Sequence, residues 1–234
     1  MRSTFSRIAI CLAMLGGTVA FVPMLSASLA IANDASDAAS LKVAAATKEQ
    51  WAMYNYGKVL IEGKGTPKDA KAAAEMFAGS AALGNNWAQF SLGELYLSGE
   101  EVDVDPWKAA DLFAKSAVQG NPWAQFKLGD MKLDGSQIPK DLPKAKELFE
   151  KSAAQSNPWA QLRLGQMYLG GIGVKRDRAK GRELIELSVA QGNLFAKVAL
   201  AEILLPSSPT KAITLLKEAA KAGNDLAKKR LKEL

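Results

Sequence analysis

Few side chains in this sequence could do enzyme chemistry. Its 234 residues include no histidine and a single cysteine, Cys11. Histidine is the only side chain whose unperturbed pKa lies near neutral pH, so its absence removes Ser-His-Asp hydrolysis, histidine acid–base catalysis and histidine-ligated metal sites. We therefore expect no catalytic residue, no metal and no cofactor, and we predict that the protein is not an enzyme.

Two short motifs look like catalytic signatures but have simpler structural explanations. Ser208-Pro209-Thr210-Lys211 fits the Ser-x-x-Lys motif of penicillin-recognising enzymes, yet the Lys-Thr-Gly and Ser-Asp-Asn partners are missing from the sequence. We expect Ser208 to be a helix N-cap followed by Pro209 at the first helical position. The segment 57–65 differs from a phosphate loop in glycine spacing and in its last residue, Gly65, where Ser or Thr is required.

Aromatic side chains at a fixed spacing are better suited to binding than to catalysis. Tryptophans recur every 36 residues, at Trp51, Trp87, Trp123 and Trp159, and Phe195 takes the next place. Glycines and asparagines recur with the same period, at Gly57, Gly93, Gly129 and Gly165 and at Asn85, Asn121, Asn157 and Asn193. A fixed period of about 20 to 50 residues indicates stacked repeats that cannot bury their apolar faces alone.

Each repeat predicts two antiparallel helices. Apolar residues fall at helical intervals in 87–99 and again in 106–118, without the alternation of a strand. The Asn-Pro-Trp sequences at 121–123 and 157–159 place Asn as N-cap and Pro at the first helical position. A glycine inside a helix costs about 1 kcal/mol relative to alanine, so we interpret the glycines at 57, 93, 129 and 165 as points of close approach by another helix.

The ends of the array predict capping helices. Residues 33–50 include a solitary second helix over 36–47, and residues 226–234 form a charged terminal helix. Polar terminal units keep a stacked array soluble. The predicted solenoid proper spans residues 51–225.

The first 32 residues have the layout of a signal peptide. A short basic start is followed by an apolar run over 8–22, and the small residues Ala30 and Ala32 offer two alternative cleavage sites. The alternative is an uncleaved anchor, which would be the chain's one contact with a membrane. We expect cleavage and a periplasmic or secreted protein. The formal net charge of +6 is too small to suggest nucleic-acid binding.

At these residues the sequence resembles the Sel-one-like repeat family, relatives of tetratricopeptide repeats. The family pattern is matched by Ala88-Gln89, Leu92-Gly93, Tyr96, Gly99, Lys108-Ala109 and 117–121, and again by repeat four. The resemblance implies an all-α fold, a right-handed α-solenoid of about five helix-turn-helix repeats of 36 residues with helical caps. It also implies a protein that holds other proteins together. Repeat five departs from the pattern, with Ala201 for Gly and a Pro206-Ser207-Ser208-Pro209 loop.

One face of the first helices is the candidate binding surface. Counting each repeat from its Trp, positions one, four, eight and eleven share a helix face, whereas Ala88, Leu92, Leu95 and Tyr96 belong to the buried one. By analogy with tetratricopeptide geometry we expect the first face to line a concave groove. Its candidate partner-binding residues are Trp51, Trp87, Trp123, Trp159, Tyr54, Phe90, Phe126, Glu94 and Asp130.

Aromatic rings beside acids suit a peptide with apolar anchors and some Lys or Arg. We therefore predict a non-enzymatic scaffold or adaptor for envelope or secreted proteins. Two alternatives remain open. The rings could simply pack between repeats, or the protein could bind cell-wall glycan (peptidoglycan) or modulate a cell-wall enzyme. The charged loops of repeat two (100–105) and repeat four (175–182) most simply form solvated faces, and the alternative for the basic loop is contact with anionic lipid, wall polymer or an acidic protein.

Overall fold

The computed structural model describes residues 37–99 and 102–234, and in these residues the chain is helical without strands. The predicted signal peptide, with Cys11, lies outside the described residues. The helices are α2 (Asp37–Ala46), α3 (Gln50–Glu62), α4 (Ala70–Ala82), α5 (Asn86–Ser98), α6 (Pro106–Val118), α7 (Pro122–Asp134), α8 (Leu142–Ala154), α9 (Pro158–Gly170), α10 (Arg178–Ala190), α11 (Leu194–Leu204), α12 (Pro209–Lys221) and α13 (Asp225–Lys232).

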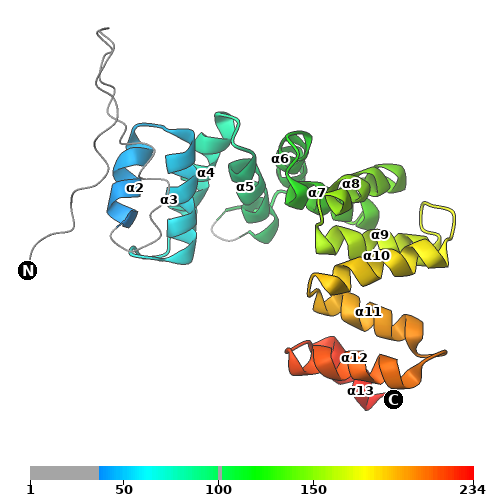
Figure 1. The fold of residues 1–234 in the computed structure, drawn as a ribbon. Coiled ribbons are helices and arrows are strands. Elements are labelled where there is room, and N and C mark those ends of the chain that lie inside the picture. The colour runs from blue at the N-terminus through cyan, green and yellow to red at the C-terminus, as the bar shows by residue number, and fades with distance from the viewer. Residues whose placement is uncertain (1–36, 100–101) are drawn as a thin grey trace, which may run out of the picture.

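Each repeat is a helical hairpin, and the hairpins stack in chain order. The first helices of repeats one to five are α3, α5, α7, α9 and α11, and each packs against the second helix that follows it. Figure 1 shows the hairpins arranged as a curved array, with α2 covering the N-terminal end and α13 the C-terminal end. The predicted solenoid with helical caps is confirmed. No helix within residues 37–99 and 102–234 is long and apolar enough to span a membrane.

The repeated asparagines begin helices and the repeated glycines end them, as predicted. The Asn121 Oδ1 accepts hydrogen bonds from the backbone N–H groups of Trp123 and Ala124, and Asn157 and Asn193 act in the same way. Gly63, Gly99, Gly135 and Gly171 end first helices in the left-handed conformation. In the described chain Ser208 takes the N-cap position of α12, but its side chain makes no capping hydrogen bond.

The glycines inside the first helices mark close helix approach, as expected. A Cβ added to Gly93 would lie 2.7 Å from Phe113 Cε1, and one added to Gly129 would lie 2.8 Å from Phe149 Cε1. In repeat four the backbones themselves come close, because a Cβ on Gly165 would lie 2.8 Å from the Gly181 carbonyl oxygen. Each glycine lowers the intrinsic stability of its helix, but it leaves the space that a large side chain of the second helix occupies.

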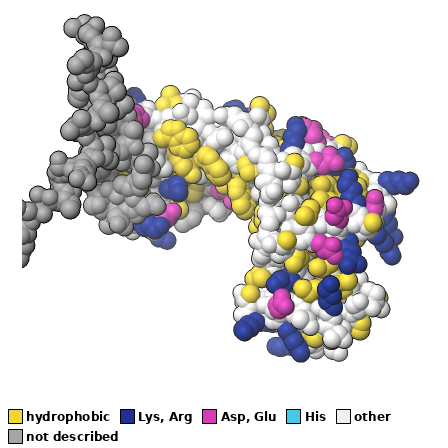
Figure 2. Space-filling view, viewed as in Figure 1, with side chains coloured by type: hydrophobic (Ala, Val, Ile, Leu, Met, Phe, Trp, Pro, Cys, Tyr) yellow, Lys and Arg dark blue, Asp and Glu magenta, His cyan; other side chains and the backbone are white. Residues whose placement is uncertain are grey.

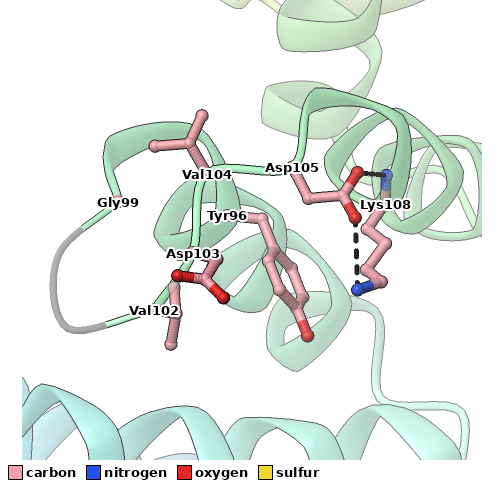
Figure 3. A pocket seen from close by; sticks show the side chains of 7 residues that line it. All are labelled: Tyr96, Gly99, Val102, Asp103, Val104, Asp105 and Lys108. Atoms are coloured by element: carbon pink, nitrogen blue, oxygen red, sulfur yellow. Dashed lines mark hydrogen bonds and ion pairs between the residues drawn. The ribbon is translucent and has the colours of Figure 1, made fainter.

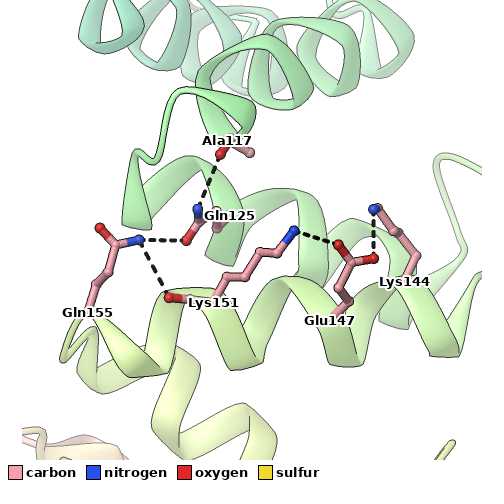
Figure 4. Close-up of polar contacts among 6 residues, drawn as sticks. All are labelled: Ala117, Gln125, Lys144, Glu147, Lys151 and Gln155. Atoms are coloured by element: carbon pink, nitrogen blue, oxygen red, sulfur yellow. Dashed lines mark hydrogen bonds and ion pairs between the residues drawn. The ribbon is translucent and has the colours of Figure 1, made fainter.

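Buried polar side chains join the helices in the same way in successive repeats. In repeat three the Ser152 hydroxyl donates to the Pro122 carbonyl at 2.6 Å, and equivalent serines do so in repeats one, two and four. The Gln125 amide donates to the Ala117 carbonyl of the preceding repeat at 3.1 Å and accepts from Gln155 at 2.8 Å (Figure 4). These bonds satisfy polar groups that stacking removes from water.

Candidate partner-binding surface

The first helices of successive repeats lie side by side. Helix α7 contacts α9, and α11 contacts α13. Ring contacts also connect first helices, with Phe126 and Trp159 centroids 6.5 Å apart and Trp159 and Phe195 centroids 5.2 Å apart. We therefore take the first-helix row as the inner face of the curved stack, and we refer to the side chains at positions one, four, five, eight and eleven as the inner face.

The N-terminal part of the inner face presents accessible rings. Trp51 is 54% exposed and meets Tyr54 edge to face at 6.0 Å, while Tyr54 lies 5.9 Å from Phe77 of the core. Repeat two has the same arrangement, since Trp87 and Phe90 centroids are 6.4 Å apart. Half-burial raises the pKa of the Tyr54 hydroxyl above its ordinary value. The position-four ring therefore lies between the position-one ring and the core.

The C-terminal part is packed more tightly. Phe126 is 8% exposed, and its ring lies between Phe149 at 6.2 Å and Trp159 at 6.5 Å. Leu162 in the same position of repeat four is also buried. At these two places the position-four side chain packs between repeats and is covered, whereas Trp123 and Trp159 remain partly exposed.

Glu94 and Asp130 are already engaged by the neighbouring repeat. The Glu94 carboxylate lies 2.9 Å from Lys127 Nζ, and the Asp130 carboxylate lies 2.8 Å from Arg163 Nε. Each base is at position five of the following repeat. The acids predicted to meet a basic partner are therefore part of charge pairs within the stack, and each pair as a whole is neutral.

Sequence reasoning missed a third such pair and a cavity beside it. Glu202, at position eight of repeat five, pairs with Arg230 of α13 through two contacts of 2.5 and 3.0 Å. The base follows the acid by 33 residues in the first two pairs but by 28 in this one, because repeat five is shorter, so a fixed spacing in the sequence does not reveal it. The cavity has a volume of about 670 Å³, mostly apolar walls and contributions from three first helices, α9, α11 and α13.

The charged loops are organised by local contacts. Figure 2 shows dark-blue side chains projecting at the right edge, where Figure 1 places the loop between α9 and α10. In this loop Arg176 donates to the Leu169 carbonyl at 2.8 Å, and just beyond it Lys180 donates to the Tyr168 hydroxyl at 2.8 Å. The Tyr168 contact raises the pKa of the Lys180 ammonium.

In repeat two, Asp105 caps α6 and lies beside Lys108, next to the Tyr96 ring (Figure 3). The backbone N–H of Lys108 lowers the pKa of the Asp105 carboxyl, and the Asp105 carboxylate raises the pKa of the Lys108 ammonium. Among the described residues no group of three or more His, Cys, Asp or Glu side chains is placed to hold a metal ion. The two loops therefore have structural explanations for their principal contacts.

The fold and this surface define a helical-repeat protein of the tetratricopeptide type, built from 36-residue hairpins. The Sel1 repeat family model matches residues 52–85, 88–121, 124–157, 160–193 and 203–224, and the chain therefore belongs to the Sel1 repeat family. Proteins of this family generally serve as protein–protein interaction scaffolds and are typically non-catalytic. Comparison with curated protein sequences gives no match.

Solved structures share the fold. A Sel1 repeat protein from Oxalobacter formigenes is 25% identical, with a TM-score of 0.76, and the match covers 86% of this chain and 87% of that one. A protective antigen of uropathogenic Escherichia coli strains with an SLR fold is 27% identical, with a TM-score of 0.74. That match covers 85% of this chain but spans 44% of the antigen.

An immunity protein, Pa5087, from Pseudomonas aeruginosa is similar in fold alone. It is 23% identical with a TM-score of 0.54, and the match covers 76% of this chain and 67% of that one.

Proposed function

We propose that this protein is a non-enzymatic adaptor that holds an extended segment of a partner protein against the inner face. The observation that carries the proposal is the exposure of large apolar side chains along that face. Trp51 is 54% exposed and Phe195 is 47% exposed, and between them Trp87, Trp123 and Trp159 are partly exposed. Clustered apolar side chains at a surface are typical of interaction sites, and aromatic side chains supply much of the binding energy at such sites.

The proposal is tested by site-specific photo-crosslinking in the producing cell. A benzophenone amino acid replaces Trp87, Trp123 or Phe195 on the inner face. The matched control position is Trp107 of α6, a second-helix tryptophan that is 62% exposed. We expect protease-sensitive adducts from the inner-face positions and none from Trp107.

Two results would contradict the proposal. Adducts formed from Trp107 alone would place the partner on the other side of the stack. Adducts that resist protease and are released by a cell-wall hydrolase would favour the glycan-binding alternative. In either case the folding of each variant is checked by its melting temperature.

We further propose that the protein is exported to the periplasm or secreted. The support is the basic, apolar and small-residue order of residues 1–32. N-terminal sequencing of the protein recovered outside the cytoplasm should give a first residue of Ile31 or Asn33. An intact N-terminus in a membrane fraction would instead indicate an uncleaved anchor.

A further inference from the structure

Ion pairs connect first helices along the inner face in a regular pattern, which we call the charge ladder. Each rung joins an acid at position eight of one repeat to a base at position five of the next unit. The rungs are Glu94–Lys127 at 2.9 Å, Asp130–Arg163 at 2.8 Å and Glu202–Arg230 at 2.5 Å. The acidic side chains are 36%, 36% and 41% exposed, so the rungs lie at the surface and cover the apolar side chains beneath them.

The ladder has no rung between repeats four and five. Position eight of repeat four is Gln166, and position five of repeat five is Ala199, so neither carries a charge. The junction between repeats one and two also lacks a rung, because Lys58 and Ser91 occupy these positions there. Between repeats four and five the polar glutamine is lost as well, because Lys197 stands where repeats two to four have Gln89, Gln125 and Gln161.

The apolar cavity lies at this interruption. Both Gln166 and Ala199 line it, and its walls include three position-one side chains, those of Trp159, Phe195 and Leu226. Phe195 is 47% exposed and Leu226 is 50% exposed, so two of its large apolar walls are open to solvent. The volume of about 670 Å³ is within the range of roughly 300 to 1,000 Å³ that is typical of ligand pockets.

The charges around the cavity favour an uncharged occupant. Arg163 and Arg230 both line it, but the first is paired with Asp130 and the second with both Glu202 and Glu233. A charged group entering between these ion pairs would lose its hydration without gaining an unpaired counter-charge. The Gln166 side-chain oxygen accepts a long hydrogen bond from Arg163 at 3.5 Å, and its NH₂ group offers donors that match the C=O of a peptide backbone.

We propose that this cavity is the main anchor pocket for the partner segment, and that it receives a bulky uncharged side chain, aromatic or branched aliphatic. The peptide group next to that side chain hydrogen-bonds to Gln166. The absent rung leaves the pocket open between two rungs whose arginines, Arg163 and Arg230, line it. This assignment rests on the proposed function, since it names the chemistry that the inner face recognises.

The test uses small capped amino acids as defined probes. The methyl groups of Ile203, Leu226 and Ala199 are followed by NMR while N-acetyl-phenylalanine methylamide is added to the protein. We expect saturable shifts at these methyls with a dissociation constant on the order of 1 mM. The corresponding lysine and glutamate methylamides should bind at least about tenfold more weakly.

Two double variants connect the binding to the missing rung. Gln166→Glu with Ala199→Arg supplies the acid and base found at the preceding junction, and it should weaken binding of the phenylalanine probe at least about tenfold. Asp111→Asn with Lys115→Ala is the control, because it removes an ion pair on the second helix α6, away from the cavity, and should leave binding unchanged. A melting temperature close to that of the parent establishes that each variant is folded.

The proposal is overturned if the three methyls do not respond to the phenylalanine probe, if the charged probes bind equally well, or if the Gln166→Glu/Ala199→Arg variant binds like the parent. Such results would leave the adaptor function standing as long as crosslinks still form from Trp87 and Trp123. Loss of those crosslinks with an intact pocket response would instead contradict the adaptor function alone.

Discussion

The junction between repeats three and four and the junction between repeats four and five share their backbone contacts but differ in their side chains. In both, the backbone N–H of an N-cap asparagine, Asn157 or Asn193, donates to the carbonyl of a buried serine in the preceding helix. The first junction adds a Gln161 bond to the Ala153 carbonyl and the Asp130–Arg163 rung. The second has Lys197 and Ala199 at the equivalent positions, and a closer ring contact between Trp159 and Phe195.

This comparison separates two tasks within one repeat. Asparagine, serine and glycine set the spacing of the helices, and they recur through the first four repeats, whereas repeat five has Ala201 and Ala219 in place of the glycine and serine. Positions five and eight lie at the inner surface, where a change alters what a partner meets without altering the stack. Changes at the residues that set the helix spacing should therefore lower stability, whereas changes at positions five and eight should not.

Removal of a ring from the helix seam should have the largest effect. Phe149 is fully buried beside Gly129, so Phe149→Ala should lower the free energy of unfolding by about 3 to 5 kcal/mol through lost contacts and a cavity. Urea denaturation measures the change. Val118→Ala, at a side chain that is 89% exposed, should change stability by less than about 0.5 kcal/mol. Equal effects would show that the seam is not the source of stability.

Adding a methyl group at the closest helix approach should destabilise repeat four more than repeat three. Gly165→Ala places a Cβ 2.8 Å from a backbone oxygen, which cannot rotate away, and should cost about 1 to 3 kcal/mol. Gly129→Ala meets the outer edge of the Phe149 ring, which can tilt, so a smaller loss is expected. Thermal melting of the two variants compares them, and a reversed order would contradict the difference in helix spacing.

Removal of the buried amide should weaken the junction between repeats three and four. Gln161 is 5% exposed, donates to the Ala153 carbonyl across the junction and accepts from Gln191 within repeat four at 2.6 Å, so Gln161→Ala should cost about 1 to 2 kcal/mol. Lys197→Ala at the next junction removes a surface pair with Glu218 and should cost at most about 1 kcal/mol. Hydrogen exchange resolves which junction opens. Similar losses of stability at both junctions would contradict the difference between them.

Ser156→Gly should stabilise the protein slightly. Ser156 has a φ of 62°, where the matching turns have Gly84, Gly120 and Gly192. A side chain in the left-handed region costs about 1 kcal/mol, and glycine removes that cost. A rise in melting temperature is expected. A fall would mean that contacts of the serine side chain outweigh the backbone strain.

The smallest expected effect is on the stability of the protein at acidic pH, through the Glu147 carboxyl. Hydrogen bonds from Lys144 and then Lys151 lower the pKa of the Glu147 carboxyl from 4.5 to about 2 (Figure 4). A depressed pKa favours the folded state above pH 4.5, and this contribution is lost as the pH falls from 4.5 towards 2. Carbon-13 NMR of the carboxyl group measures the titration, and Glu147→Gln should flatten this part of the acid dependence of stability. A midpoint near 4.5 would contradict the contact.

Almost all of the fold can be predicted from the sequence, because the same helix-forming signals recur in successive repeats. The N-cap role of Asn121, the close approach at Gly93 and the burial of Ala88 and Leu92 follow from local preferences and helical spacing, and the structure confirms them. The surface was less predictable. The pairing of Glu94 with Lys127 and the covering of Phe126 depend on how far neighbouring repeats rotate, which no single repeat encodes.

The most direct test of the account is the affinity of the crosslinked partner, measured by calorimetry for the parent protein and two variants. The account predicts at least about tenfold weaker binding to Gln166→Glu/Ala199→Arg, and unchanged binding to Trp107→Ala on the second-helix side. Unchanged binding to the first variant together with weaker binding to the second would contradict it.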